Sequence, residues 1–241
     1  MQKRLVRKLD LEIALSRIGP HPSPEAKLEQ YTITPKLAAD LLYTAAYSYD
    51  DIEGREVADL GCGTGTLAIG SALLGAELAV GVDIDRAVVR IASRNAKELG
   101  VKGKTQWIAS KIDVLRGDFD TVLQNPPFGV QRRTADRQFL EKALEIGKRV
   151  YSLHMSTQRS NRFSRAPKKK TSQLSQVPPS PFLEKFIQSC GGEVKVVYTM
   201  LMTIPWMFGF HRKRKHEFTV DLYVVERKPM HAMPSSPSLE E

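Results

Sequence analysis

The chain has 241 residues, 41% of them hydrophobic and 26% charged, and a formal net charge of +9. This composition is that of a folded protein and argues against wholesale disorder. The two cysteines, Cys62 and Cys190, lie far apart without a CxxC pair, which argues against a disulfide scaffold or a cysteine-rich zinc site. No apolar run reaches the roughly 18 residues that a membrane helix needs. We therefore expect a cytoplasmic protein without a membrane anchor or a bound metal.

Strands and helices are predicted to alternate along most of the chain. Apolar spacing predicts helices over 5–18, 36–47, 66–74, 85–99, 136–148 and 182–189, and strands over 57–60, 78–82, 106–109, 121–123, 150–153, 194–203 and 216–226. Such alternation is typical of an α/β fold in which helices cover both faces of a mostly parallel sheet. We expect a sheet of seven strands in a single domain that spans 1–229 and includes N-terminal helices within 1–48.

Residues 155–181 interrupt this pattern, because they are rich in Ser, Pro and basic residues and show no periodicity. We interpret them as a mobile insertion and residues 230–241 as a disordered tail. Positive charge is concentrated around the insertion. Residues 148–216 contain 14 Lys or Arg and two acids, which leaves a net charge of −3 for the rest of the chain. A basic excess confined to one third of the chain suggests a face that binds a polyanion.

A glycine-rich turn follows the first predicted strand of the sheet and opens the next helix. It reads Asp59-Leu-Gly-Cys-Gly-Thr-Gly-Thr66, with Gly61, Gly63 and Gly65 at alternate positions. Glycine allows the backbone to turn sharply and to pass close to a ligand. The dinucleotide fingerprint is GxGxxG, and here the third glycine comes one residue early, which weakens a nicotinamide interpretation.

Carboxylates around this turn favour a cationic ligand that carries a ribose. Asp59 precedes the turn, where it disfavours a pyrophosphate and suits an ammonium group. Asp83 ends the second strand, where an acid accepts hydrogen bonds from ribose hydroxyls. Asp113 and Val114 follow the third strand, and Asp113 is a candidate for the adenine amino group. Together these residues predict a site for S-adenosylmethionine, which has a ribose, an amino acid moiety and no phosphate.

The turn Asn125-Pro126-Pro127-Phe128 ends another predicted strand. Each proline fixes its own φ and pushes the residue before it into an extended conformation, so Asn125 is held rigidly at a carboxyl strand end. The Asn125 side-chain oxygen and a proline carbonyl are two acceptors that suit a planar amino group. Holding both hydrogens of that group frees its nitrogen lone pair toward a methyl sulfonium, and Phe128 can stack on an unpaired base. We therefore predict that Asn125, Pro126, Pro127 and Phe128 form the catalytic site.

Beyond these two turns, several short stretches of sequence indicate a particular protein family. They are Glu29-Gln30-Tyr31, Thr34-Pro35, Tyr49-Asp50-Asp51-Ile52, Gly81-Val-Asp-Ile-Asp85, Val150-Tyr-Ser-Leu-His154 and Phe210-His-Arg-Lys213. With them, the chain resembles class I S-adenosylmethionine-dependent methyltransferases that carry the amino-group motif (N/D)PP(Y/F). More narrowly, it resembles the archaeal and eukaryotic N6-adenine methyltransferases of small-subunit ribosomal RNA, the methyltransferase-like five family. The resemblance runs from about Leu28 to Val225 and leaves out the insertion.

This resemblance implies a Rossmann-like fold, S-adenosylmethionine as cofactor and RNA as substrate. It also implies that Gln30 and an adjoining threonine lie over the cofactor. Thr32 and Thr34 compete for that role, and we favour Thr34 because it precedes a proline. Thr64 and Thr66 stand in the cofactor turn. Some relatives pair with a small zinc-binding activator subunit, which is therefore a candidate partner. The insertion departs from the family pattern, and its role stays open.

Basic residues near aromatic ones are the candidates for RNA binding. Residues 206–215 combine aromatic side chains with the run Arg212-Lys213-Arg214-Lys215. Aromatic rings stack on bases and Lys or Arg contact phosphates, a combination common in single-stranded RNA sites. We predict that this run and the insertion's Lys168-Lys169-Lys170 grip the RNA backbone.

Three other functions compete with RNA methylation. Related Asn-Pro-Pro-Tyr enzymes methylate a glutamine amide in a protein, and a DNA adenine is a further target. A catalytically silent RNA-binding scaffold is the non-enzymatic alternative. Phe128 in place of Tyr and the basic third of the chain favour nucleic acid. The intact set of Asp59, Asp83 and Asn125 favours an enzyme.

Overall fold

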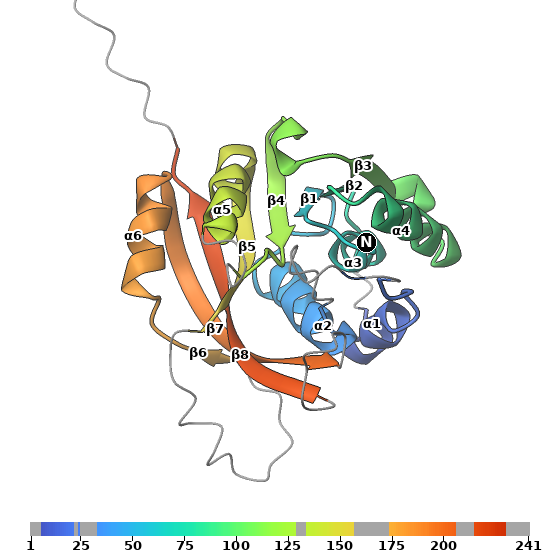
Figure 1. Cartoon of the computed structure of the whole chain (residues 1–241), viewed down its shortest axis with the longest axis horizontal. Coiled ribbons are helices and arrows are strands. Elements are labelled where there is room, and N and C mark those ends of the chain that lie inside the picture. Colours follow the sequence, from blue (N-terminus) through green and yellow to red (C-terminus); the bar gives the residue numbers. More distant parts are fainter. Residues whose placement is uncertain are drawn as a thin grey trace, which may run out of the picture.

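A single mixed sheet organises the chain in the computed structural model, which describes residues 6–21, 24, 33–128, 134–156, 174–205 and 215–229. Eight strands lie in the order β3-β2-β1-β4-β5-β8-β7-β6 (Figure 1). They are β1 (Glu56–Leu60), β2 (Leu78–Asp83), β3 (Thr105–Ala109), β4 (Phe119–Gln124), β5 (Gly147–Met155), β6 (Ser175–Gln176), β7 (Gly192–Pro205) and β8 (Lys215–Arg227). The first five strands pair in parallel, and the last three join them by antiparallel pairing. The expected α/β fold with a mainly parallel sheet is confirmed.

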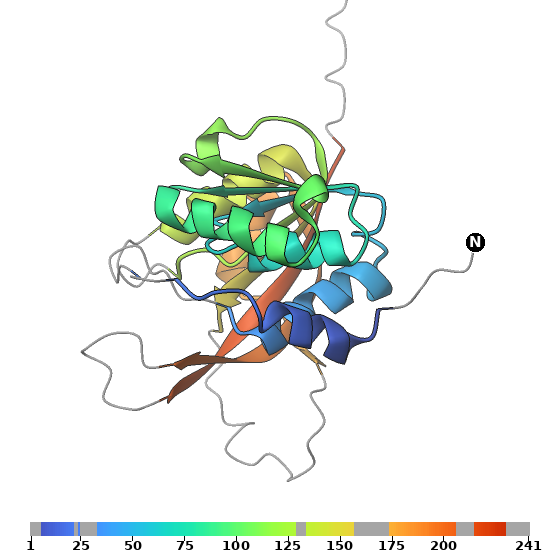
Figure 2. The same cartoon turned by 90° about the vertical axis from the view of Figure 1, so that its right-hand side faces the viewer.

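Helices cover both faces of this sheet (Figures 1 and 2). They are α1 (Lys8–Leu15), α2 (Pro35–Tyr43), α3 (Thr66–Leu73), α4 (Arg86–Glu98), α5 (Ala135–Ile146) and α6 (Pro181–Ser189). Strand residues alternate between the two faces, as the period of two requires. Val57 belongs to the core cluster that contains α1 and α2 residues, whereas its neighbour Ala58 belongs to the cluster that contains α5 and α6 residues. The central strands are therefore buried on both sides, which explains their continuous apolar sequences.

The expectation of seven strands was wrong by one short strand. Ser175 and Gln176 form β6, which pairs with Thr199 and Tyr198 of β7. These two residues fall inside the segment expected to be irregular, because a two-residue strand leaves no periodic pattern in a sequence. That segment is also shorter than 155–181, since Met155 ends β5 and Pro181 begins α6. Residues 157–173 and 230–241 lie outside the described residues.

The helix expected over 36–47 is divided into two kinds of turn. Regular α2 ends at Tyr43, and a π-helical segment, Thr44–Ser48, follows. The Thr44 hydroxyl donates a hydrogen bond of 2.8 Å to the carbonyl of Asp40. A side chain that bonds the carbonyl four residues earlier competes with the regular helical ladder. Apolar spacing does not reveal such a local change of helix type.

Three strands bring their carboxyl ends to one edge of the sheet. Leu60 at the end of β1 lies opposite Val82 of β2 on one side and Gln124 of β4 on the other. The glycine turn, Asp83 and Asn125 all follow or end these strands, so the fold gathers them at one place. Within the described ranges, no helix is long and apolar enough to cross a membrane.

Candidate active site

A cavity of about 960 Å³ opens at this carboxyl edge of the sheet. It is lined by nine of the residues predicted for the site: Asp59, Gly61, Gly63, Thr64, Thr66, Asp83, Asp113, Asn125 and Pro127. Open α/β sheets bind ligands at this kind of crevice, outside the carboxyl ends of their strands. The two turns that the sequence singled out therefore face a common space.

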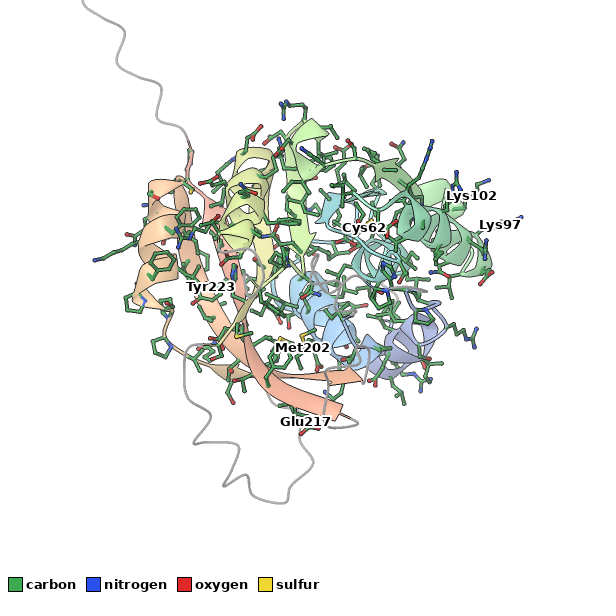
Figure 3. All side chains as sticks on the ribbon, in the orientation of Figure 1. Cys62, Lys97, Lys102, Met202, Glu217 and Tyr223 are labelled. Atoms are coloured by element: carbon green, nitrogen blue, oxygen red, sulfur yellow. The ribbon has the colours of Figure 1, made fainter. Side chains whose placement is uncertain are left out.

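The glycine turn is tied to the neighbouring strand by its backbone. The amides of Gly61 and Cys62 both donate to the carbonyl of Val82, at 2.9 and 3.0 Å. Gly63 has φ +52°, and a Cβ built on it would meet no protein atom within 4 Å. Because Gly63 lines the cavity, its bare backbone leaves room for a ligand against the turn. Figure 3 shows Cys62 of this turn in the interior of the molecule.

The third glycine of the turn has a different task. Gly65 has φ +92°, and a Cβ there would approach Trp107 of β3 to 2.6 Å. It is absent from the cavity lining and packs against β3 and α4 instead. Gly65 thus has a packing role, because close approach of helix and sheet requires a residue without a side chain, and its cofactor contact stays a prediction.

Asp59 presents a deeply buried carboxylate to the cavity. Its side chain is 1% exposed and accepts a hydrogen bond of 3.0 Å from the backbone nitrogen of Ala68, in the first turn of α3. Burial raises the pKa of Asp59 to about 7, against the opposing effect of that hydrogen bond. No cation of the described residues pairs with Asp59, so this buried acid favours a ligand that brings a positive charge.

Asp83 is held by two backbone donors at the end of β2. One carboxylate oxygen accepts from the nitrogen of Gly63 at 2.9 Å, and the other accepts from the nitrogen of Asp85 at 2.9 Å. Burial raises the pKa of Asp83, and these two hydrogen bonds oppose that shift. Each oxygen retains a second lone pair that can accept from a hydroxyl group in the cavity.

The Asn-Pro-Pro-Phe turn rests on a buried polar chain. Gln124 donates to the hydroxyl of Ser152 at 2.8 Å, and that hydroxyl lies 2.8 Å from Nε2 of His154. All three side chains are at most 3% exposed. Burial lowers the pKa of His154 to about 4, so its imidazole is neutral at physiological pH and acts here as a structural partner.

The four residues of this turn do not all reach the cavity. Asn125 and Pro127 line it, whereas Pro126 and Phe128 do not. Phe128 packs edge-on against Phe218 of β8, with ring centroids 5.8 Å apart and an interplanar angle of 88°. This contact holds the turn against the antiparallel half of the sheet.

Two further predicted cofactor residues lie away from the cavity. Val114 is 50% exposed and is not among the lining residues, although Ile112 and Asp113 are. Thr34 is the N-cap of α2, and its hydroxyl accepts from the nitrogen of Leu37 at 3.3 Å. Its neighbour Ile33 lines the cavity instead. Thr34 precedes a proline because that is the usual start of a helix.

Several predicted residues lie outside the described part of the chain: Gln30, Thr32, Lys168, Lys169, Lys170, Arg212, Lys213 and Arg214. Lys215 begins β8, and its side chain is likewise outside the description.

Sequence reasoning missed several lining residues that come from distant segments. His21 lines the cavity, and its Nε2 lies 3.4 Å from a carboxylate oxygen of Asp85. Lys142 of α5 lines it too, is 4% exposed, and pairs with Glu145 at 2.9 Å. A helical pattern shows which face of α5 is buried but does not distinguish burial in a core from burial in a cavity wall. No signal in the sequence identified these residues.

The donor set fits S-adenosylmethionine. The buried carboxylate of Asp59 and the carboxylate of Asp83 suit its ammonium group and its ribose hydroxyls. The open Cβ position of Gly63 leaves space beside them. Together with the parallel sheet covered on both faces, this site defines a class I S-adenosylmethionine-dependent methyltransferase.

Comparisons with known proteins place the chain within this class. The family model of ribosomal protein L11 methyltransferases (PrmA) matches residues 42–126. The rRNA N(6)-adenosine-methyltransferase METTL5 of Danio rerio is 32% identical, over 88% of this chain and 95% of the relative. Protein MJ0284 of Methanocaldococcus jannaschii, for which no function is named, is 38% identical over 92% of this chain and 95% of its own length. The chain belongs to the METTL5 family.

A solved structure agrees with this membership. The crystal structure of PH1948, a candidate RNA methyltransferase from Pyrococcus horikoshii, is 38% identical and superimposes with a TM-score of 0.76. The match covers 94% of this chain and all of the other.

Proposed function

We propose that the protein transfers a methyl group from S-adenosylmethionine to the exocyclic N6 of an unpaired adenine in RNA, and that this adenine lies in small-subunit ribosomal RNA. The observation that carries the proposal is that Asn125 and Pro127 line the same cavity as Asp59 and Asp83. A site for an amino group and a site for the methyl donor thus share one space. Membership in a family whose named relatives are rRNA N6-adenosine methyltransferases supports the choice of RNA.

Within this proposal each residue has a defined task. Bound S-adenosylmethionine supplies a methyl group on a positively charged sulfur. Asp59 and Asp83 hold the donor by its ammonium group and ribose, and the backbone at Gly63 lets it approach the turn. The Asn125 side-chain oxygen and a proline carbonyl of the same turn accept the two hydrogens of the adenine amino group. Acceptance of both hydrogens draws the nitrogen lone pair out of conjugation with the ring.

The target base has to be unpaired. In a duplex its amino group would be hydrogen-bonded to the partner base and could not enter the cavity. Phe128, anchored by its contact with Phe218, remains our candidate for stacking on the flipped base. Neutral His154 supports the turn through Ser152 and Gln124 and takes no proton. The methylated amino group carries a surplus proton after transfer, and because conjugation with the ring makes that proton acidic, it passes to water. The mechanism therefore relies on orientation and electrostatics without a strong base.

The alternatives from the sequence receive less support. An Asn-Pro-Pro-Phe turn alone does not separate adenine methylation from glutamine methylation or from a silent scaffold. Relatives that match nearly their whole length are named as RNA adenosine methyltransferases. Two relatives named as ribosomal protein L11 methyltransferases match only 47% and 30% of this chain. RNA is thus the substrate class that the comparisons favour.

A zinc-binding activator subunit is part of the proposal as a partner. Its support in this chain is β3, the longer of the two edge strands of the described sheet, whose outer backbone groups can accept a further strand. Action on ribosomal RNA also agrees with the cytoplasmic location expected from the sequence, and that location stays a prediction.

The decisive experiment incubates the purified protein with labelled cofactor and with separate RNA, protein and DNA fractions. We expect label in small-subunit rRNA and recovery of N6-methyladenosine after digestion to nucleosides. The matched control is Asn125→Ala, which should bind the cofactor without transferring label. Label in a glutamine of a protein, or no label in RNA from an organism lacking the enzyme, would refute the proposed function.

A further inference from the structure

Helix α4 carries a row of cations on its outer face. The row consists of Arg86, Arg90, Arg94 and Lys97, which we call the α4 basic strip, and all four residues are exposed. At 100° per residue they fall within an arc of roughly 80°, and they extend over about 17 Å of helix. The opposite face of α4 buries Ala92 and Ala96 toward the sheet and α3 and turns Val88 to the cavity, so the helix presents its strip outward.

The cations of the strip have no acidic partner. None of the four makes an ion pair within the described part of the chain. Other exposed cations behave differently: Lys148 pairs with Asp120 at 3.0 Å, and Lys36 pairs with Asp40 at 2.9 Å. A row of four uncompensated charges is costly through mutual repulsion unless a polyanion is its counterpart.

The strip also stands out from its surroundings in charge. Residues 86–104 contain four Arg or Lys of the strip, Lys102, Lys104 and one acid, Glu98, for a net charge of +5. The chain outside residues 148–216 totals only −3, so the strip lies in an otherwise acidic part of the sequence. Figure 3 shows Lys97 and Lys102 at the same outer margin of the molecule, pointing away from the sheet.

The position of the strip connects it to the active site. Asp83 and Ile84 line the cavity, and Arg86 follows two residues later at the start of α4. The strip therefore begins close to the cavity rim and leads away from it along the helix. Figure 2 shows α4 running across the face of the molecule that is turned to the viewer, separate from the α5–α6 side.

We propose that the α4 basic strip binds the phosphate backbone of the RNA that flanks the target adenine. This inference rests on the proposed function and adds residues that the sequence analysis did not single out for RNA binding. Arginine, which forms three of the four positions, suits phosphate oxygens through its planar fork of donors. Successive strip residues rise by about 6 Å, so a single strand or one side of a helix can contact them in turn.

The chemistry of the face favours RNA over the other polyanionic or acidic surfaces. A membrane-surface helix places large apolar side chains beside its cations, and a protein interface has an apolar or aromatic centre. The strip has neither, because the other exposed side chains of α4 are Ala87 and Glu98, and Ile91 and Ser93 are half-buried, so this helix exposes no large apolar side chain. A face of this composition is typical of backbone contacts to a nucleic acid.

The test uses the full-length protein with Arg86, Arg90, Arg94 and Lys97 all changed to Gln. A matched control changes Arg7, Lys36, Lys148 and Lys195 to Gln, which removes the same charge from exposed cations that have acidic partners. Glutamine is a good helix former, so α4 is expected to remain folded, which circular dichroism and thermal unfolding check. Both variants are titrated with the rRNA fragment that the wild type methylates.

We expect the strip variant to bind this fragment at least tenfold more weakly at physiological salt. In a plot of the logarithm of the association constant against the logarithm of the salt concentration, the slope should be shallower than that of the wild type by about three units. Each lost phosphate contact removes roughly 0.7 to 0.9 of a unit. Its kcat/KM on a short oligonucleotide that contains only the target loop should match the wild type. The control variant should keep most of the affinity and the salt slope.

Each other result overturns the inference. Equal affinity and slope in the strip and control variants would show that general charge, not this face, attracts RNA. Loss of a co-purifying protein with unchanged RNA binding would assign the strip to a protein partner. If the wild type methylated no RNA at all, the proposed function itself would fail, which is a different outcome from an unaffected strip variant.

Discussion

The backbone nitrogen of Gly63 donates a hydrogen bond of 2.9 Å to the carboxylate of Asp83. Two motifs twenty residues apart, the glycine turn after β1 and the acid that ends β2, are thus locked together before any ligand binds. The second oxygen of Asp83 is fixed by the nitrogen of Asp85 at 2.9 Å. The carboxylate is therefore preorganised toward the cavity, which reduces the entropy lost on binding.

Replacement of Asp83 by Asn should weaken cofactor binding. An amide has one acceptor oxygen where the carboxylate has two, so one of the two backbone donors loses its partner and the ribose loses a charged acceptor. Hydrogen bonds to charged groups contribute about 1.5–3 kcal/mol, so we expect a loss of roughly 10- to 100-fold in affinity for S-adenosylmethionine. Isothermal titration calorimetry measures this directly. Asp118→Asn, whose carboxylate pairs with Lys148 and Arg227 and does not line the cavity, is the control, and equal losses in both variants would contradict the role of Asp83.

Replacement of Asn125 by Ala should separate binding from chemistry. Asn125 lines the cavity beside the cofactor residues but comes from the other turn. The affinity for S-adenosylmethionine should therefore stay near that of the wild type. Loss of one preorganised acceptor should lower kcat by about 10²- to 10³-fold, by analogy with the removal of a single oxyanion donor. Single-turnover methylation of RNA measures the rate, and an unchanged kcat would remove Asn125 from the mechanism.

Cofactor affinity should depend on pH through Asp59. Burial raises the pKa of Asp59 to about 7, and the cationic donor favours the ionised form. Above pH 7 the carboxylate is already ionised and binding is strongest. Below pH 7 a proton has to be released on binding, so the affinity should fall by up to tenfold per pH unit. Calorimetry between pH 5.5 and 8.5 tests this, and Asp59→Asn should bind weakly with no such dependence.

The same shift predicts how the unliganded protein responds to pH. The pKa of Asp59 is higher in the folded chain, at about 7, than its ordinary value of 3.8, so the folded state binds this proton more tightly. The contribution of Asp59 to the free energy of unfolding is therefore complete below about pH 4. It is lost as the pH rises to about 7, by on the order of 1 kcal/mol per pH unit. Urea unfolding of the wild type and of Asp59→Asn isolates the effect: the difference between them should change over this pH range and be constant above it.

Local chemistry explains which parts of the site could be predicted from the sequence. Gly63 and Asn125 were found because each imposes its own backbone behaviour, a positive φ in one case and a proline-fixed strand end in the other. Asp83 was found because the end of a strand is recognisable from its apolar residues. In all three, the feature that places the residue lies within a few positions of it.

The rest depended on tertiary packing. His21 and Lys142 reach the cavity only because α5 and the segment after α1 come to its rim, and nothing near them in sequence indicates this. Thr34 shows a second kind of limit: the proline after it marks the start of α2, and Ile33 lines the cavity beside it, so the cofactor contact of Thr34 stays a prediction. Strand β6 could not be predicted for the same reason, because its two residues form a strand only through their pairing with β7.

The contact between Gly81 and Trp107 gives a prediction about the support beneath the site. A Cβ at Gly81 of β2 would lie 2.5 Å from the Trp107 ring and 3.0 Å from Sγ of Cys62. Gly81→Ala should therefore force the indole of β3 and the glycine turn apart, with a loss of about 1–3 kcal/mol in stability and weaker cofactor binding. The control is Gly103→Ala, where a Cβ meets nothing within 4 Å. Chemical denaturation and cofactor titration measure both effects. Wild-type stability in Gly81→Ala would mean that Trp107 can move aside freely, and that the close packing of β2 against β3 does not hold the turn in place.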